Sequence, residues 1–159
     1  SLSDNLVYTG SKNIKDKVEN SPLNAGKLVL SPTRTCAPIL NEVFNNIGRN
    51  NINGIIHCSG GAQTKILHFI DNLHIIKDNL FDIPPVFKLI QAESSTKWRE
   101  MYQVFNMGHR MELYVDEKFA DEIIKTSKSF DVDAKIIGRV QSSNEKKLTI
   151  SSKHGTFEY

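Results

Sequence analysis

The chain has 159 residues, and 20 lysines and arginines against 18 aspartates and glutamates leave a net charge of +2. This length suits one domain that buries a sizeable core without metals or disulfides, and the near-balanced charge excludes a broad electrostatic field for nucleic acid or membrane. No apolar run approaches the roughly 20 residues that span a bilayer, and the start shows no signal-peptide pattern, so we expect a cytoplasmic protein.

The first 26 residues carry scattered polar residues and loop-forming clusters, and we interpret residues 1–26 as an arm or linker. A short apolar run occupies 27–30. Helical and strand periodicity then predicts, in chain order, a helix over 35–47, a strand over 54–58, a helix over 63–70, a strand over 73–77, helices that begin at 84 and 96, a strand over 109–115, a helix over 116–127, and strands over 134–140 and 148–151. The last two strands are expected to form a hairpin.

Because strands and helices alternate along most of the chain, the sequence predicts an α/β (α+β) fold, with helices on both faces of a mixed sheet. Residues 27–159 are expected to form this single domain. Cys36 and Cys58 lie in apolar settings and are predicted to be packing residues. The histidines lack the spacing of metal ligands, so we expect no metal site.

A strand that ends at His57 runs directly into a glycine-rich turn and the start of a helix. Gly60 and Gly61 allow a sharp turn and a close approach of the backbone to a ligand. Ser59 and Thr64 add hydroxyl groups, and the N–H groups of the following helix favour an anion. The alternative is a tight turn without a ligand. The P-loop and dinucleotide fingerprints are both absent.

Two other segments combine polar side chains with turn residues. Asn106, Gly108 and His109 lie between a predicted helix and a strand, where they indicate either a binding turn or a simple helix stop. Thr33 and Arg34 precede the first long helix, where the hydroxyl indicates a helix cap and the guanidinium suits a phosphate or a carboxylate.

Together these segments carry an ordered set of motifs: Pro32-Thr33-Arg34, then His57-Cys58-Ser59-Gly60-Gly61, a proline-led helix over Pro84–Gln91, and Glu100–Gly108, which reads Glu-Met-Tyr-x-x-Phe-Asn-Met-Gly. In this order and over roughly residues 27–152 the chain resembles the C-terminal domain of phosphoribosylformylglycinamidine cyclo-ligase, or AIR synthase, of purine biosynthesis.

The resemblance implies an α/β/α layered domain with a partial ferredoxin-like topology. It implies an ATP-dependent ligase that converts formylglycinamidine ribonucleotide to aminoimidazole ribonucleotide. In that family an N-terminal domain of the same polypeptide binds most of the ATP and magnesium and forms the main homodimer interface. The present chain is therefore expected to be one half of a larger enzyme and inactive alone.

The family's active site lies in the groove between the two domains. Carried over by position, the resemblance makes His57 the catalytic proton carrier or donor. It makes the following residues line the groove and bind substrate or phosphate: Thr33, Arg34, Ser59, Gly60, Gly61, Asn106, Gly108 and His109.

The chain departs from the family pattern at three places. Ala62 stands where a third glycine is common, Ile90 where an aromatic residue is frequent, and His109-Arg110 where small or apolar residues are usual. These differences bear on the detailed substrate contacts more than on the family. Two alternatives stay open. One is half of a related ATP-dependent kinase or synthetase, such as a thiamine-phosphate kinase or a hydrogenase-maturation protein. The other is a non-catalytic phosphate-binding or docking module.

Overall fold

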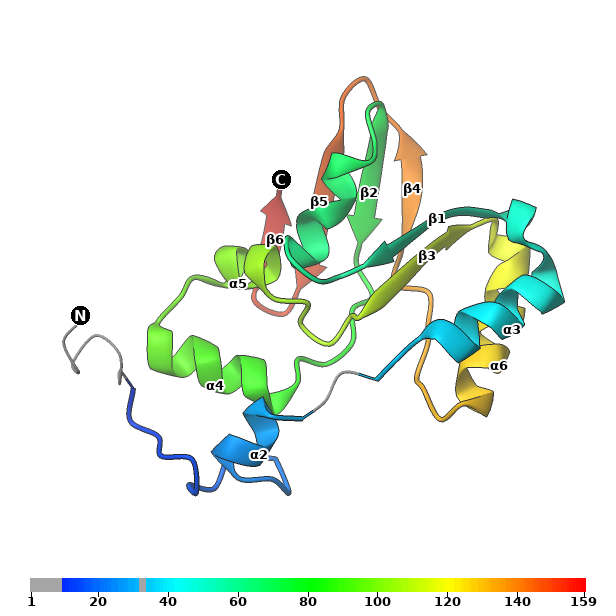
Figure 1. The fold of residues 1–159 in the computed structure, drawn as a ribbon. Helices are drawn as coiled ribbons and strands as arrows, with labels where there is room; N and C mark the ends of the chain where they lie inside the picture. Colours follow the sequence, from blue (N-terminus) through cyan, green and yellow to red (C-terminus); the bar gives the residue numbers. More distant parts are fainter. Residues whose placement is uncertain (1–9, 32–33) are drawn as a thin grey trace, which may run out of the picture.

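A computed structural model describes residues 10–31 and 34–159 and shows an α+β fold (Figure 1). The helices are α2 (Ala25–Val29), α3 (Ala37–Ile47), α4 (Pro85–Ser94), α5 (Trp98–Val104) and α6 (Ala120–Ser129), with 3-10 segments η1 (Arg49–Asn51), η2 (Ala62–His68) and η3 (Glu117–Phe119). The strands are β1 (Ile52–His57), β2 (Leu73–Lys77), β3 (Met111–Val115), β4 (Gly138–Ser142), β5 (Lys147–Ser152) and β6 (Gly155–Glu158). No helix in the described ranges is long and apolar enough to cross a membrane.

The strands form one four-stranded mixed sheet and one two-stranded ribbon. The four-stranded sheet has the order β4-β2-β5-β6, with β2 and β5 parallel and the outer pairs antiparallel. The ribbon pairs β1 with β3 in antiparallel register, so that His57 faces Met111. The mixed sheet that the alternation of elements predicted is confirmed.

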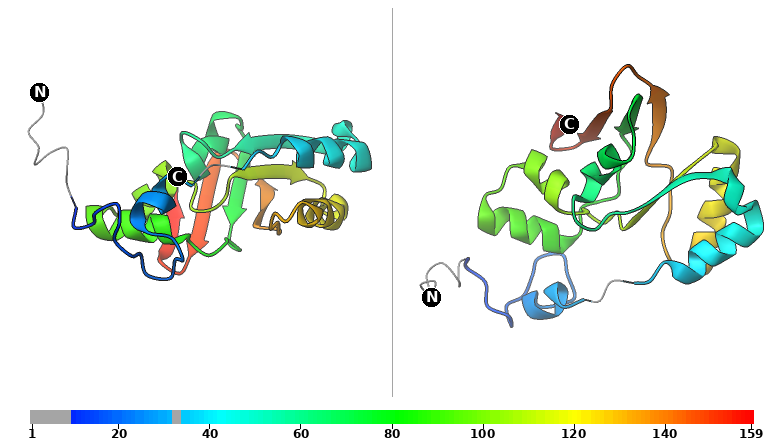
Figure 2. Two further views of the ribbon diagram at one scale, coloured as in Figure 1. Left: turned by 60° about the horizontal axis from the view of Figure 1, so that its bottom comes forward. Right: turned by 45° about the horizontal axis from the view of Figure 1, so that its top comes forward.

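The β1–β3 ribbon has packed residues on both sides. On one side Leu113 and Ile52 pack against the buried residues of α3, including Val43, which is 1% exposed. α6 contributes Ile123 to the same cluster. On the other side Ile56 and Tyr114 join the larger core. Figure 2 shows the α3–α6 pair at one end of the molecule and α2 and α4 at the other.

The larger core joins the four-stranded sheet to η2 and α5. Alternation in β5 turns Leu148 and Ile150 inward, where both are 0% exposed. They pack in one cluster with Met101 and Tyr102 of α5 and with Ile66 of η2. Burial of these side chains is the main stabilising term, because each large apolar side chain contributes about 1.5–3 kcal/mol.

A lysine lies inside this core. Lys77, at the end of β2, is 1% exposed and forms a 2.6 Å ion pair with Glu112 of β3. Its ammonium also donates to the carbonyl and side-chain oxygens of Gln63, at 2.9 and 3.0 Å. Tyr114 donates to the other oxygen of Glu112 at 2.8 Å. The pair therefore connects the sheet, the ribbon and η2 through hydrogen bonds that satisfy both charges.

The predicted hairpin of the last two strands is wrong. β4 and β5 do not pair with each other, because β2 lies between them and pairs with both. The connection between them crosses the end of β2, where Ser143 donates to the carbonyl of Asn72 at 3.1 Å. The strand predicted over 134–140 begins only at Gly138. β5 instead forms its hairpin with β6, a strand that the sequence reading missed.

Most other predicted elements occur close to their expected positions, as Leu73–Lys77 and Pro85–Ser94 show. The predicted helix over 63–70 is a 3-10 segment, whose tighter turns suit a short segment. The apolar run over 27–30 overlaps helix α2, which Asn24 caps by accepting from the Lys27 N–H at 2.9 Å. Part of the expected arm contacts the domain, because the Ser11 hydroxyl donates to Glu93 of α4 at 2.8 Å.

Substitution of Gly138 by alanine should weaken the pairing of β4 with β2. A Cβ atom at this position would lie 1.8 Å from the backbone oxygen of Ile76, so one strand must move. We expect a loss of about 2 kcal/mol or more in the free energy of unfolding, the upper range for overpacking. Urea denaturation of the chain measures it, with Ser142→Ala on the same strand as the control. Equal stability of the two variants would contradict the close approach.

Candidate functional site

The glycine turn follows β1 in a left-handed path. Gly60, Gly61 and Ala62 have φ angles of +34°, +78° and +42°. Glycine adopts this region freely, whereas it costs a residue with a Cβ atom about 1–2 kcal/mol. A Cβ atom at Gly60 would meet nothing within 4 Å, so the outer side of the turn is open. Ala62, at the usual third-glycine position, keeps the left-handed conformation and is 2% exposed.

Lys65 closes the inner side of this turn. Its ammonium donates to the backbone oxygens of His57 and Ser59, both at 3.1 Å, and lies 3.4 Å from the Ser59 hydroxyl. The side chain thus bridges the end of β1 to η2 and places a positive charge beside the glycines. These bonds hold the start of the turn to one residue of η2.

A groove of about 700 Å³ opens on the turn. Its lining consists of one wall from the glycine turn and η2 and one wall from α5 and the residue before it: Gly60, Gly61, Thr64 and His68, then Lys97, Arg99, Glu100, Gln103 and Val104. Lys97 and Arg99 bring two positive charges to this groove and Glu100 brings one negative charge. Within the described residues neither cation forms an ion pair with a carboxylate.

Arg99 is held in place by the last residues of the chain. Its guanidinium lies 4.5 Å from the centre of the Tyr159 ring and donates to the backbone oxygen of Glu158. Stacking on an aromatic face orients the planar guanidinium while leaving other N–H groups free. The groove lining therefore includes an oriented guanidinium, a group that suits a phosphate or a carboxylate.

The Asn106 turn is tied to η2. Its backbone oxygen accepts from the Gln63 side chain at 2.8 Å, and its own side-chain oxygen accepts from the Gly108 N–H at 2.9 Å. Gly108 has a φ angle of +97°, and a Cβ atom there would lie 3.1 Å from the ring of Pro84. The left-handed backbone and the nearby proline both favour glycine at position 108. The close contact with Pro84 holds this turn against the start of α4.

His109 lies away from the groove lining. It is 3% exposed, its ring centre lies 5.1 Å from that of Phe81, and its Nε2 atom accepts from the Phe81 N–H at 3.2 Å. Burial lowers the pKa of His109 to about 4, and the positive charges of Lys77 and Lys135 act in the same direction. His109 is therefore neutral near pH 7 and serves as a hydrogen-bond acceptor.

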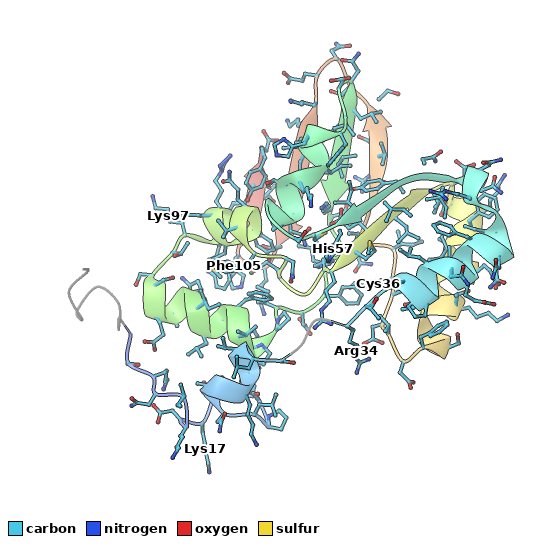
Figure 3. The ribbon with its side chains drawn as sticks, in the orientation of Figure 1. Lys17, Arg34, Cys36, His57, Lys97 and Phe105 are labelled. Atoms are coloured by element: carbon cyan, nitrogen blue, oxygen red, sulfur yellow. The ribbon has the colours of Figure 1, made fainter. Side chains whose placement is uncertain are left out.

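The structure brings only part of the predicted site together. Gly60 and Gly61 line the groove, and Ser59 lies next to them, where its oxygen accepts from Lys65. His57 precedes this turn (Figure 3). His57 is exposed at the end of β1. Arg34 instead donates to the backbone oxygen of Asp131 at 2.9 Å, next to the end of α6. Thr33 lies outside the described residues.

Figure 3 shows Lys97 and Phe105 on one side of His57 and Arg34 and Cys36 on the other.

Cys58 is 3% exposed in the core, which confirms a packing residue. Burial and then the Glu112 charge raise the pKa of its thiol to about 12. In the described ranges, no three histidine, cysteine or acidic side chains gather closely enough to hold a metal ion.

Sequence reasoning missed the charged residues around the turn. Lys65 follows the glycines by one helical turn, which is a usable signal. Lys77 ends β2, and Glu112 lies on the face of β3 opposite to Met111, Leu113 and Val115. The alternation of β3 therefore predicts an outward-pointing Glu112, and only the tertiary structure shows that it is buried. No sequence signal identified Lys97 or Arg99, because only packing places α5 opposite η2.

The low pKa of His109 predicts a loss of stability below neutral pH. The unfolded chain, with an ordinary histidine pKa of 6.5, takes up a proton that the folded chain accepts only near pH 4. The neutral, buried ring contributes its full stability above the unfolded pKa, and this stability is lost as the pH falls. At about pH 5.5 we expect the free energy of unfolding to be about 1 kcal/mol lower than at neutral pH. Urea denaturation at neutral pH and at about pH 5.5 measures this change. His109→Gln is the control, and an equal loss in both proteins would contradict the assignment.

Comparison with known proteins gives a consistent result. Residues 14–151 match the family described as AIR synthase related protein, C-terminal domain. The phosphoribosylformylglycinamidine cyclo-ligase of Syntrophus aciditrophicus is 32% identical over 161 residues, which cover 95% of this chain and 44% of that protein. The same enzyme of Methanocaldococcus jannaschii is 34% identical over 130 residues, which cover 79% of this chain and 37% of that protein.

The chain therefore spans less than half the length of these curated relatives. Among solved structures, the hydrogenase maturation protein HypE of E. coli superposes with a TM-score of 0.55 at 10% identity, over 86% of this chain and 44% of that chain. At this identity the likeness shows the fold alone. The match of 14–151, which covers most of the residues, shows that the chain belongs to the family of AIR synthase related C-terminal domains.

Proposed function

We propose that this chain is the C-terminal domain of an ATP-dependent cyclo-ligase, which converts formylglycinamidine ribonucleotide to aminoimidazole ribonucleotide in de novo purine biosynthesis. The observation that carries this proposal is the groove between the glycine turn and α5. There Lys97 and Arg99, which form no ion pair among the described residues, lie opposite a turn whose outer side is open. The names of the relatives supply the reaction, and the groove supplies a place for the phosphate of its substrate.

In this proposal the groove residues hold and orient the phosphate. Gly60 and Gly61 let the ligand contact the backbone, while Arg99 and Lys97 provide charge-assisted donors. His57, exposed at the end of β1, donates or carries a proton beside the turn. In the reaction ATP phosphorylates the formyl amide oxygen, a nitrogen of the same substrate closes the ring, and ADP and phosphate leave. Positioning and charge stabilisation, rather than a covalent nucleophile, suit such chemistry.

The remaining parts of the enzyme are assigned to another domain. We propose that an N-terminal domain of the same polypeptide binds ATP and magnesium, forms the main homodimer contact and closes the groove, and that the enzyme works in the cytoplasm. The isolated chain should then produce no aminoimidazole ribonucleotide from ATP and substrate. Chromatographic detection of product is the measurement, and ATP-dependent turnover by the isolated chain would refute this division of roles.

Substitution of Gly61 by valine in the full-length enzyme should reduce kcat/KM at least about tenfold. A Cβ atom there lies 3.7 Å from Lys65, and the φ angle of +78° strains any branched residue, so the turn must change shape. Gly48→Val is a matched control, because Gly48 has the same φ angle but ends α3, outside the groove lining. Steady-state kinetics of both variants decides the point, and normal activity of the Gly61 variant would exclude this role of the turn.

A further inference from the structure

Gln63 joins the glycine turn of the groove to the Asn106 turn, whose residues Asn106 and Gly108 do not line the groove. It follows Gly60-Gly61-Ala62 directly and is 0% exposed. Its side-chain nitrogen donates to the backbone oxygen of Asn106 at 2.8 Å, so this one residue fixes the distance between the glycine turn and the Asn106 turn. Both turns therefore depend on where the side chain and backbone of Gln63 are held.

Lys77 holds Gln63 in place. The ammonium has three N–H donors, and the structure gives each one an acceptor: the Gln63 backbone oxygen, the Gln63 side-chain oxygen and Glu112. The two bonds to Gln63 come from one charged group, so they fix both the backbone and the side-chain rotamer of that residue. Charge-assisted bonds of this kind are roughly twice as strong as neutral ones.

Glu112 in turn fixes the position of Lys77. Its carboxylate lies 2.6 Å from the ammonium, and its second oxygen accepts from Tyr114 of the same strand at 2.8 Å. The side chains of Lys77 and Glu112 are 2% and 4% exposed. The position of η2 is thus set by one residue from the four-stranded sheet and one from the ribbon.

Stability alone gives no reason for this arrangement. Removal of two charges from water is costly, and packed apolar residues of similar size are often as stable as a buried ion pair or more stable. An apolar pair could fill the same space, but it would leave Gln63 without directional bonds. What the charges add is a fixed orientation of η2 and of the turn that precedes it.

We propose that Lys77, oriented by Glu112, is a positioning residue that acts through Gln63 to hold the glycine turn and the Asn106 turn in one geometry. This inference rests on the proposed function, because it assigns the network to the same groove. Lys77 itself does not line the groove.

The test uses the full-length polypeptide with Lys77→Met and Glu112→Leu combined. We expect a variant that still folds but has a kcat/KM about 10–100-fold lower, since displacement of a site by about 1 Å can cost that much. The matched control is Lys125→Met with Glu122→Leu, an exposed pair on α6, which should leave kcat/KM unchanged. A folded double variant with normal kcat/KM would overturn the positioning role.

Hydrogen exchange separates failure of this inference from failure of the proposed function, because it needs no activity. In the double variant the amides of Thr64, which donates to the Gly61 backbone oxygen, and of Gly108, which donates to the Asn106 side chain, should exchange at least about tenfold faster, while that of Val43 in α3 should not change. Unchanged exchange at both turns overturns the inference even if the enzyme proves to be a cyclo-ligase. Faster exchange in a protein without cyclo-ligase activity supports the network and rejects the reaction.

If the double variant does not fold, a single substitution tests whether Gln63 couples the two turns. Gln63→Glu keeps both acceptors for Lys77 but removes the donor to the Asn106 oxygen. We expect faster exchange at Gly108 and little change at Thr64, whose amide donates to the Gly61 backbone oxygen. Equal protection at Gly108 in this variant and in the unmodified protein would show that Gln63 does not couple the two turns, and would overturn the proposal.

Discussion

The buried ion pair between Lys77 and Glu112 is the contact on which the rest of the arrangement depends. β2 and β3 belong to different sheets, and their charged side chains meet where the apolar core reaches η2. Two charges in such a place are tolerated only when their hydrogen bonds are satisfied, and Gln63 and Tyr114 complete that set. A polar network that must be complete admits far fewer arrangements than apolar packing does.

This constraint explains how a seven-residue 3-10 segment keeps a defined position. Ile66 packs in the core, Gln63 bonds to the buried ammonium, and Lys65 bonds to the backbone at the inner side of the turn. The glycine turn is thus fixed at its base and open at its outer side. The opposite wall is fixed differently, because Arg99 stacks on Tyr159 at the end of the chain. Together the two walls make a groove with an excess of positive charge.

The elements with strong local signals were predictable. Leu73–Lys77 and the helix over Pro85–Ser94 follow from apolar runs and from the preference of proline for a first helical turn. Gly60 and Gly61 were recognised because a left-handed turn needs glycine. Pairing between strands was not predictable in the same way. Closeness in sequence favours a hairpin of β4 with β5, yet β2 pairs with both, since contacts of high sequence separation leave no local pattern.

The sequence by itself determined the family, the mixed α/β character, and the strand–glycine–helix turn, because each depends on residue types at short and fixed spacing. Only the tertiary structure decided that Lys77 and Glu112 meet in the core, that Arg99 lines the groove, and that His109 and Arg34 lie against other partners. The physical reason is that the partner and environment of a charged or polar side chain are set by packing between distant segments. No pattern within a single segment reports that packing.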